Sequence, residues 1–328
     1  MRRFIFLLVV GAAAWASYTV LAPTGPRGEA FVEIRPGTST MQIAAQLKDE
    51  GLIRSKYAFE ATRLAKGGTL KAGEYRFDHP AKLAEVYDRL ERGDMYTLSV
   101  TIPEGSNLFD IAERIEAAKL GTKEEFLAAA HVDVGLIADL DPGATSLEGY
   151  LFPDTYSFER RATPQQMLSA MVKRFRQAAA GLGLKSNYHR VVTVASLVER
   201  ETPVDAERPL VASVFENRLA KEMPLMTDPS VIYAALLDGR YRGTIYASDL
   251  QADSPYNTYR YSGLPPGPIC NPGMTSLKAA MNPAQTDYLY FVAASADPSG
   301  KSRFSTTLEE HAHDVQRYRK SLREAGSR

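Results

Sequence analysis

Two carboxylates at the end of an apolar helical pattern are the residues of this chain that are best placed for acid–base chemistry. The segment 189–202 repeats apolar residues at three- and four-residue steps, which predicts a helix with one buried face, and Pro203 ends it. Glu199 and Glu201 lie in its last turn. A spacing of two residues turns their side chains about 200° apart on a helix. They therefore cannot share one pocket.

Glu201 is the candidate proton donor. It follows Leu197 by four residues, which places it at the end of the apolar face. A carboxyl group against apolar side chains has its charged form disfavoured, so its pKa rises towards the range in which it can donate a proton near neutral pH. The alternative is that Glu199 and Glu201 are solvated residues at a helix end, paired with Arg200 or Arg208.

Two further stretches combine aromatic and polar residues. In SLEGYLFPDTYSF, residues 146–158, the carboxylates of Glu148 and Asp154 alternate with aromatic rings, which suits either a sugar site or a core strand and turn. Residues 254–273, SPYNTYRYSGLPPGPICNPG, contain five prolines and cannot form a regular helix. Ordering such a long polar loop is costly, and binding is the usual reason for it.

The N-terminus has the pattern of a membrane anchor. Phe4 to Ala22 is a run of nineteen residues without a charge, which is long enough to cross the hydrocarbon core of a bilayer. Arg2 and Arg3 precede it and predict that the N-terminus stays in the cytoplasm. A cleaved signal peptide is the alternative, because Ala14-Trp15-Ala16 has the form of a cleavage site. In either case the rest of the chain is exported, and residues 23–28 form a short linker.

Charge and cysteine content exclude several classes of partner. The 39 basic and 39 acidic side chains give a net charge of zero, which argues against nucleic acid as a partner. Cys270 is the only cysteine, so the chain has no internal disulfide and no cysteine-based metal cluster. His311 and His313 point to different sides of a helix and are interpreted as surface residues. We expect neither a metal nor a cofactor.

A small module is predicted to follow the anchor. The pattern indicates a strand at 31–34, helices from Ser39 and over 55–66, a strand at 73–77 and a helix at 83–92. This order resembles a LysM module, the βααβ unit that binds chains containing N-acetylglucosamine. The alternative is a domain that only packs or acts as a spacer.

The sequence pattern of the remaining residues predicts a larger mixed α+β domain. Helices are expected at 164–180, 189–202, 206–220, 230–237, 277–281 and 308–322. Asp228 is a natural cap for the helix over 230–237. A buried strand at 288–293 is expected to pair with 302–306 across the turn Asp297-Pro298-Ser299-Gly300.

Eight motifs together resemble the MltG, or YceG-like, family of endolytic murein transglycosylases. They are EGYLFPDTY (148–156), ASLVERET (195–202), ERPLVASVFENRL (207–219), TDPSVIY (227–233), SPYNTYRYSGLPPGPICNPG (254–273), SLKAAMNP (276–283), YLYFVA (288–293) and FSTTLEEH (304–311). The resemblance implies a single-pass inner-membrane protein, with residues 1–23 as cytoplasmic tip and anchor, 24–96 as the LysM-like module and 97–328 as a periplasmic catalytic domain. Its partners would be peptidoglycan glycan strands and, as a further class, peptidoglycan synthases.

The resemblance also implies a site and a reaction. The glutamate before threonine in E-x-E-T is catalytic in the family, which is Glu201 here, and Glu199 then has a supporting role. The enzyme would cut the β-1,4 bond between N-acetylmuramic acid and N-acetylglucosamine in nascent strands and leave 1,6-anhydro ends, terminating elongation.

Candidate substrate-binding residues follow from the same resemblance and from residue type. Tyr256, Asn257 and Tyr259 would line the sugar cleft, with Glu148 nearby and Asp228 bound to the sugar, although each is also compatible with packing. Two other functions compete: a hydrolase of the same bond that activates water with Asp228 or Glu148, and a glycan-binding scaffold without turnover.

Overall fold

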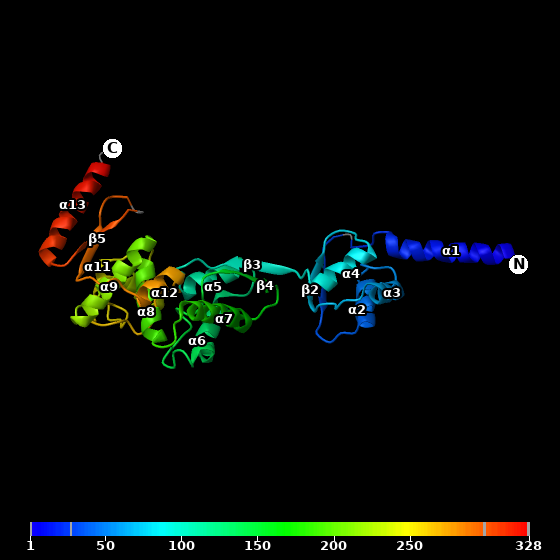
Figure 1. The fold of residues 1–328 in the computed structure, drawn as a ribbon, viewed down its shortest axis with the longest axis horizontal. Helices are drawn as coiled ribbons and strands as arrows, with labels where there is room; N and C mark the ends of the chain where they lie inside the picture. Colours follow the sequence, from blue (N-terminus) through cyan, green and yellow to red (C-terminus); the bar gives the residue numbers. More distant parts are fainter. Residues whose placement is uncertain (1, 27, 298–299, 327–328) are drawn as a thin grey trace. The chain divides into compact units, whose positions relative to one another are not determined.

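The computed structural model describes residues 2–26, 28–297 and 300–326 (Figure 1). The chain divides into two compact units, residues 1–98 with 157–161 and residues 99–156 with 162–328. The strands pair in two-stranded sheets, β1 with β2, β3 with β4 and β5 with β6, among many helices. The predicted mixed α+β class is thus confirmed.

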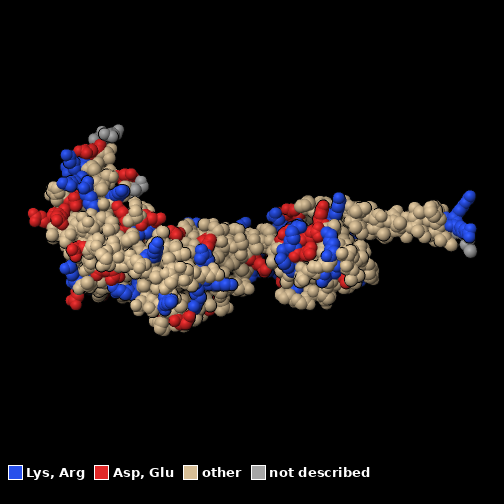
Figure 2. Space-filling model, in the orientation of Figure 1, with Lys and Arg blue, Asp and Glu red and all other residues tan. Residues whose placement is uncertain are grey.

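The first unit begins with the apolar helix α1 (Arg2–Leu21), in which no residue after Arg3 carries a charge. By length and composition it can cross a membrane, as predicted. Figure 2 shows its uncharged surface and the basic residues at its N-terminal end.

The rest of the first unit follows the predicted order of elements. It contains β1 (Ala30–Ile34), α2 (Thr40–Asp49), α3 (Lys56–Lys66), β2 (Gly73–Phe77) and α4 (Leu83–Arg92). The β1 and β2 strands are antiparallel, with Ala30 opposite Phe77. Ser39 and Ser55 accept hydrogen bonds from the first-turn backbones of α2 and α3 and so fix where these helices start. A core that includes Leu47, Phe59 and Tyr75 joins the elements.

The second unit is larger. Its elements, in chain order, are β3 (Thr97–Thr101), α5 (Leu108–Ala117), α6 (Lys123–Val132), the 3-10 turn η1 (Asp133–Ile137), β4 (Thr155–Glu159), α7 (Pro164–Leu182), α8 (Tyr188–Glu201), the 3-10 turn η2 (Asp205–Glu207), α9 (Arg208–Ala220), α10 (Asp228–Leu237), α11 (Ala247–Leu250), α12 (Met274–Met281), β5 (Tyr290–Ala293), β6 (Ser302–Ser305) and α13 (Leu308–Gly326). The first two residues of β3 and the last three residues of β4 are counted with the first unit.

Helix α8 is the central helix of this unit. Every residue from Val192 to Val198 is buried, and the helix packs against α9, α10 and α12. Its apolar face shares a core with Phe215 of α9 and Tyr233 of α10. This burial on all sides fixes the position of the C-terminal end of α8, where the candidate carboxylates lie.

Three local predictions need correction or completion. Asp228 is not a cap: α10 starts at Asp228 itself, and Thr227 precedes it without a side-chain capping bond. Strand β5 starts at Tyr290 and its four residues are half-buried, so the prediction of a buried strand from 288 was wrong. The hairpin with β6 is confirmed, and residues 298–299 of its expected turn lie outside the described residues.

Gly149 allows three segments of the second unit to meet. Its backbone has φ of +87°, and a Cβ atom there would lie 2.5 Å from the Pro268 side chain and 2.7 Å from that of Val192. Both the left-handed conformation and this close approach require glycine. The 148–156 segment therefore packs tightly between α8 and the 254–273 loop.

We expect Gly149→Ala to lower the free energy of unfolding by about 2 kcal/mol or more, because the added methyl group meets strained backbone and two neighbours at once. Thermal unfolding followed by circular dichroism measures it. Gly181→Ala, inside α7 with no atom within 4 Å of its Cβ position, is the matched control and should gain about 0.5–1 kcal/mol. Equal stability of the two variants would contradict the close packing of Gly149 against Pro268 and Val192.

Candidate active site

A pocket of about 400 Å³ opens at the C-terminal end of α8, and Glu201 lies in its wall. Several segments distant in sequence complete it. The lining residues are Glu201 of α8, Phe215 and Arg218 of α9, Leu225, Met226, Asp228 of α10, Tyr259 of the 254–273 loop, Tyr290 and Phe291 of β5, and Leu308 and His311 of α13. All of them belong to the second unit.

Glu201 is a carboxylic acid without a counter-ion. Burial raises its pKa to about 7, the nearby Thr227 hydroxyl lowers it, the charge of Asp228 raises it and the charge of Arg218 lowers it. Among the described residues Glu201 forms no ion pair, and the Thr227 hydroxyl has no hydrogen-bond partner of good geometry. Near neutral pH this group is therefore partly protonated and can both donate and accept a proton.

Glu199 is held on the other side of the helix. Its Oε1 lies 2.9 Å from Nη1 of Arg208, and both side chains are buried. Its Oε2 accepts a hydrogen bond of 2.9 Å from the Gly273 backbone. The two carboxylates thus point apart, as their spacing predicts, and only Glu201 faces the pocket. The alternative is correct in pairing Glu199 with Arg208, but that pair is buried and not solvated, and Glu201 has no such pair among the described residues.

Arg218 is fixed by the backbone around the pocket. Its Nε donates to the Leu289 carbonyl at 2.7 Å, and its Nη1 donates to the Leu225 carbonyl at 2.7 Å. Its guanidinium also lies 5.2 Å from the centre of the Tyr290 ring. Burial lowers the pKa of Arg218 from its usual value. Because carbonyls and a ring hold it, Arg218 contributes positive charge without forming an ion pair with Glu201.

Asp228 and Tyr259 form a second polar group in the wall. The Tyr259 hydroxyl donates to Oδ1 of Asp228 at 2.6 Å. Burial first, and then this bond to Asp228, raise the pKa of the Tyr259 hydroxyl, so it stays protonated. Thr258 joins their two segments, since its hydroxyl accepts from the Thr227 backbone at 3.0 Å and its carbonyl from Met226 at 3.1 Å.

Asn257 lies behind Tyr259 and not in the pocket wall. It is fully buried, and its amide donates to the carbonyls of Leu250 and Ala252 at 3.0 and 2.9 Å. Its Oδ1 accepts from the Tyr259 backbone at 3.1 Å. The geometry makes Asn257 a residue that sets the course of the loop and thereby places Tyr259.

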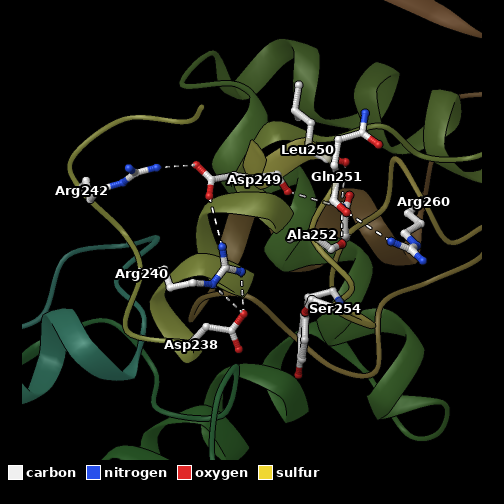
Figure 3. Close-up of polar contacts among 11 residues, drawn as sticks. Asp238, Arg240, Arg242, Asp249, Leu250, Gln251, Ala252, Ser254 and Arg260 are labelled. Carbon is white, nitrogen blue, oxygen red and sulfur yellow. Dashed lines mark hydrogen bonds and ion pairs between the residues drawn. The ribbon is translucent and has the colours of Figure 1, made fainter. Parts of the chain in front are cut away.

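The segment before this loop, which contains α11, is held by ion pairs around Asp249, whose side chain is buried (Figure 3). Arg240 and Arg242 lie 3.3 and 3.8 Å from its two oxygens, and Arg240 also contacts Asp238 at 2.6 Å. Arg260 donates to the Gln251 carbonyl at 3.2 Å. The segment before the loop is thus tied to the end of α10 and to the loop itself.

Glu148 and Tyr256 lie away from Glu201, along a separate cavity of about 10 Å³. Glu148 is only 2% exposed, and its oxygens accept hydrogen bonds from the Leu108 backbone and the Asn271 amide, both at 2.9 Å. Burial raises the pKa of Glu148 to about 8. The Tyr256 ring packs edge-on against Tyr233 at 5.1 Å.

The aromatic residues around Glu148 are core residues too. Tyr150, Phe152 and Phe158 are buried, and the Tyr150 hydroxyl donates to Asp141 at 2.8 Å. For the 146–158 stretch the structure thus shows aromatic residues that pack in the core, whereas strand β4 is mostly exposed and buries only Phe158.

His311 is the residue most clearly missed from the sequence. The interpretation of His311 as a surface residue is wrong, whereas His313 is indeed exposed. The His311 ring stacks on Tyr290 with centroids 5.1 Å apart, and its Nδ1 is buried without a partner among the described residues. Burial lowers its pKa below the usual value. The motif FSTTLEEH contains His311 and the motif ERPLVASVFENRL contains Arg218, so membership of these motifs was the available signal for both residues.

We infer the tautomer of the neutral His311 ring from the partner that its buried Nδ1 lacks among the described residues. A buried N–H without an acceptor is rarer in proteins than an acceptor without a donor. A proton on Nε2 leaves the buried Nδ1 as the unpaired acceptor. This tautomer gives the ring a hydrogen-bond donor on its other nitrogen.

The described residues contain no group of three or more histidine, cysteine, aspartate or glutamate side chains that could hold a metal ion. The pocket itself is lined by carboxyl, guanidinium, hydroxyl and imidazole groups. These groups can transfer protons and form hydrogen bonds with a polar ligand.

Comparison with known proteins gives a consistent result. A family model described as the YceG-like family matches residues 32–317. The chain is 35% identical over 340 residues to a Bacillus subtilis protein named endolytic murein transglycosylase, covering 97% of this chain and 93% of that protein. A Streptococcus pneumoniae protein of the same name is 30% identical over 353 residues, covering 95% of this chain and 63% of that one.

A solved structure is similar as well. A yceG-like protein from Listeria monocytogenes is 34% identical, with a TM-score of 0.56, and the match covers 88% of this chain and 99% of that chain.

We expect Glu201→Gln to be more stable than the wild type at pH 8 and equally stable at pH 4. Because the folded-state pKa is about 7 and the ordinary value is 4.5, the unfolded chain releases its proton first as pH rises. Stability is thus lost between these two values and stays lower above pH 7. The difference should be on the order of 1–2 kcal/mol, since solvent in the pocket screens part of the penalty.

Thermal unfolding at both pH values measures this difference. Glu199→Gln is the control: it weakens a buried ion pair and should lower stability at pH 8 by on the order of 3 kcal/mol. If the Glu201→Gln variant is less stable than the wild type at pH 8, the claim that Glu201 has a raised pKa and no counter-ion is refuted.

Proposed function

Since this chain belongs to the YceG-like family, we propose that it is an endolytic murein transglycosylase whose acid and base is Glu201. The proposal depends on the Glu201 carboxyl group. Burial raises its pKa to about 7, it forms no ion pair among the described residues, and it lies in the wall of a pocket. The names of the relatives supply the substrate class.

One carboxyl group suffices for the proposed reaction. Protonated Glu201 donates its proton to the oxygen that links C1 of N-acetylmuramic acid to N-acetylglucosamine, and the C1–O bond breaks. The C6 hydroxyl of the muramic residue then attacks C1 and forms the new C1–O bond, while its proton returns to Glu201. The products are a free hydroxyl and a 1,6-anhydro end. No water is consumed, unlike in hydrolysis by a pair of carboxylates.

We assign the other pocket residues to substrate binding. Tyr259 and Asp228 present a fixed hydroxyl–carboxylate pair that suits sugar hydroxyls. Arg218 stabilises the Glu201 carboxylate that forms when the proton leaves, because its charge favours the ionised state. The His311 imidazole offers a donor to a hydroxyl or acetamido oxygen, and the stacked Tyr290 ring adds an aromatic wall.

Glu148, Tyr256 and Asn257 receive supporting roles in this proposal, since each is buried or lies along another cavity. Glu148 fixes the first turn of α5 through Leu108. Asn257 places Tyr259. Their substitution should affect turnover through the position of the loop, without direct contact to sugar.

The first unit and the anchor complete the proposal. We propose that α1 is a single-pass anchor in the cytoplasmic membrane, with the second unit on the periplasmic side. The β1-α2-α3-β2 order supports a LysM-like role for the first unit in glycan binding. Nascent strands close to the membrane would be the substrate, their elongation would end at the cut, and peptidoglycan synthases would be neighbours there.

Digestion of purified peptidoglycan by the full-length protein in detergent tests the reaction, with the products identified by mass spectrometry. Wild type should release fragments with 1,6-anhydro ends, and Glu201→Gln should release none, because amide nitrogen cannot replace the acid. Reducing ends would identify a hydrolase, for which Asp228 is the candidate base. Binding of sacculi without any cleavage would instead identify a scaffold.

We expect His311→Phe to lower kcat/KM by roughly three- to tenfold, the value of one lost hydrogen bond, while the stack on Tyr290 persists. Affinity for glycan fragments, measured by calorimetry in the Glu201→Gln background, should fall by a similar factor. His313→Ala, two residues further along α13 and exposed, is the matched control. Unchanged affinity in His311→Phe would remove His311 from the binding site.

A further inference from the structure

The C-terminal end of α1 is bound to the first unit and is not joined to it by a free linker. Nη2 of Arg54 donates to the Pro23 carbonyl at 2.9 Å, and its Nη1 donates to the Ala22 carbonyl. Thr24 and Ala81 exchange backbone hydrogen bonds of 2.9 and 3.1 Å. The described residues after the helix, 23–26, are thus pinned to the unit, contrary to the linker expected from the sequence.

Two aromatic residues lie in the C-terminal half of α1, on the side of the helix end that meets the first unit. Trp15 and Tyr18 are both exposed, lie near the C-terminal end of the helix and have ring centroids 6.3 Å apart. Tryptophan and tyrosine are enriched at the headgroup level of membranes. The Arg54 guanidinium lies 4.5 Å from the centre of the Tyr18 ring. The first unit therefore contacts α1 next to an aromatic residue of the kind that is common at the headgroup level.

Helix α3 starts two residues after Arg54 and packs against α1. Figure 1 shows α3 on the side of the first unit from which α1 extends, whereas β2 lies on the side away from it. The exposed face of α3 contains two large apolar side chains, Tyr57 at 70% and Leu64 at 80% exposure. They lie seven residues apart, so they share one face across two turns.

Basic residues flank this face. Nζ of Lys56 lies 5.3 Å from the centre of the Tyr57 ring. Lys66, at the end of the helix, is paired with Asp88 at 2.5 Å. Glu60 is the only acidic residue of α3; it lies between Tyr57 and Leu64 on the same face, and one of its carboxylate oxygens is buried. An aromatic and an aliphatic side chain beside cations is the composition of helices that lie in a membrane interface.

We propose that Arg54, Lys56, Tyr57 and Leu64, the α3 face, rest in the phospholipid headgroup layer of the membrane that α1 crosses. This inference rests on the proposed anchoring by α1 and is independent of the reaction. Tyr57 and Leu64 enter the boundary between headgroups and acyl chains, and the two cations contact phosphate groups. The first unit is thereby held against the outer leaflet at a fixed orientation.

The test uses the full-length protein in nanodiscs of phosphatidylcholine with phosphatidylglycerol. Tyr57→Cys and Leu64→Cys, each in a Cys270→Ser background, are labelled with an environment-sensitive fluorophore. Quenching by lipids spin-labelled at the headgroup is then measured. Arg35→Cys is the matched control, because Arg35 is exposed and follows β1, whose partner β2 lies away from α1. Trp15, the single tryptophan, reports the insertion of α1 in every sample.

We expect labels at 57 and 64 to be quenched at least twofold more than the label at 35. Lys56→Glu should reduce the quenching at 57 while Trp15 stays quenched. Equal quenching at 57, 64 and 35 with Trp15 inserted would overturn the proposal. A Trp15 that lipid does not quench would overturn the anchor and the α3 face together. Digestion of peptidoglycan by the same samples tests the reaction separately.

Discussion

The second unit depends on one costly arrangement, a half-buried carboxyl group at the end of α8 that has no counter-ion among the described residues. An unpaired carboxylate in such a place destabilises the folded chain, so the group keeps its proton up to a pH of about 7. The cost is offset by the packing of α8, which is buried along seven consecutive residues. The same burial that raises the pKa of Glu201 also fixes its position.

Glu199 shows how differently the same residue type behaves two positions earlier. It has a buried arginine and a backbone N–H as partners, and so contributes a structural ion pair. Arg218, which could have paired with Glu201, is instead bound by carbonyls on both sides. Its charge still acts across the pocket, which keeps the pKa of Glu201 from rising further. The site thus combines an acid that holds its proton with a cation that favours its release.

Part of this arrangement was predictable from the sequence. Apolar periodicity located α8 and showed that Glu201, and not Glu199, lies at the end of the apolar face. Capping residues and turns located most helices, including α2 and α3 after Ser39 and Ser55. These are local properties, and local patterns determine them. For this reason Glu201, at the end of α8, could be named as a candidate from the sequence.

The rest of the pocket depends on contacts between distant segments. Residue type alone cannot distinguish Tyr259 from Tyr256, which lies three positions earlier in the chain. Tyr259 lines the pocket, whereas Tyr256 packs on Tyr233. Asn257 has the composition of a sugar ligand, yet three of its hydrogen bonds go to backbone groups. His311 reaches the pocket only because α13 packs against β5 and β6. Such pairings across the chain have no periodic signal.

The central claim concerns the proton on Glu201, and it can be measured without any substrate. Infrared difference spectra between the wild type and Glu201→Gln isolate the C=O band of this one protonated carboxyl, even though Glu148 also keeps its proton. Following the band against pH gives the pKa directly. The account predicts a midpoint near 7. A midpoint near the ordinary value of 4.5 would show that the group is solvated, and the proposed acid would then be ionised at neutral pH.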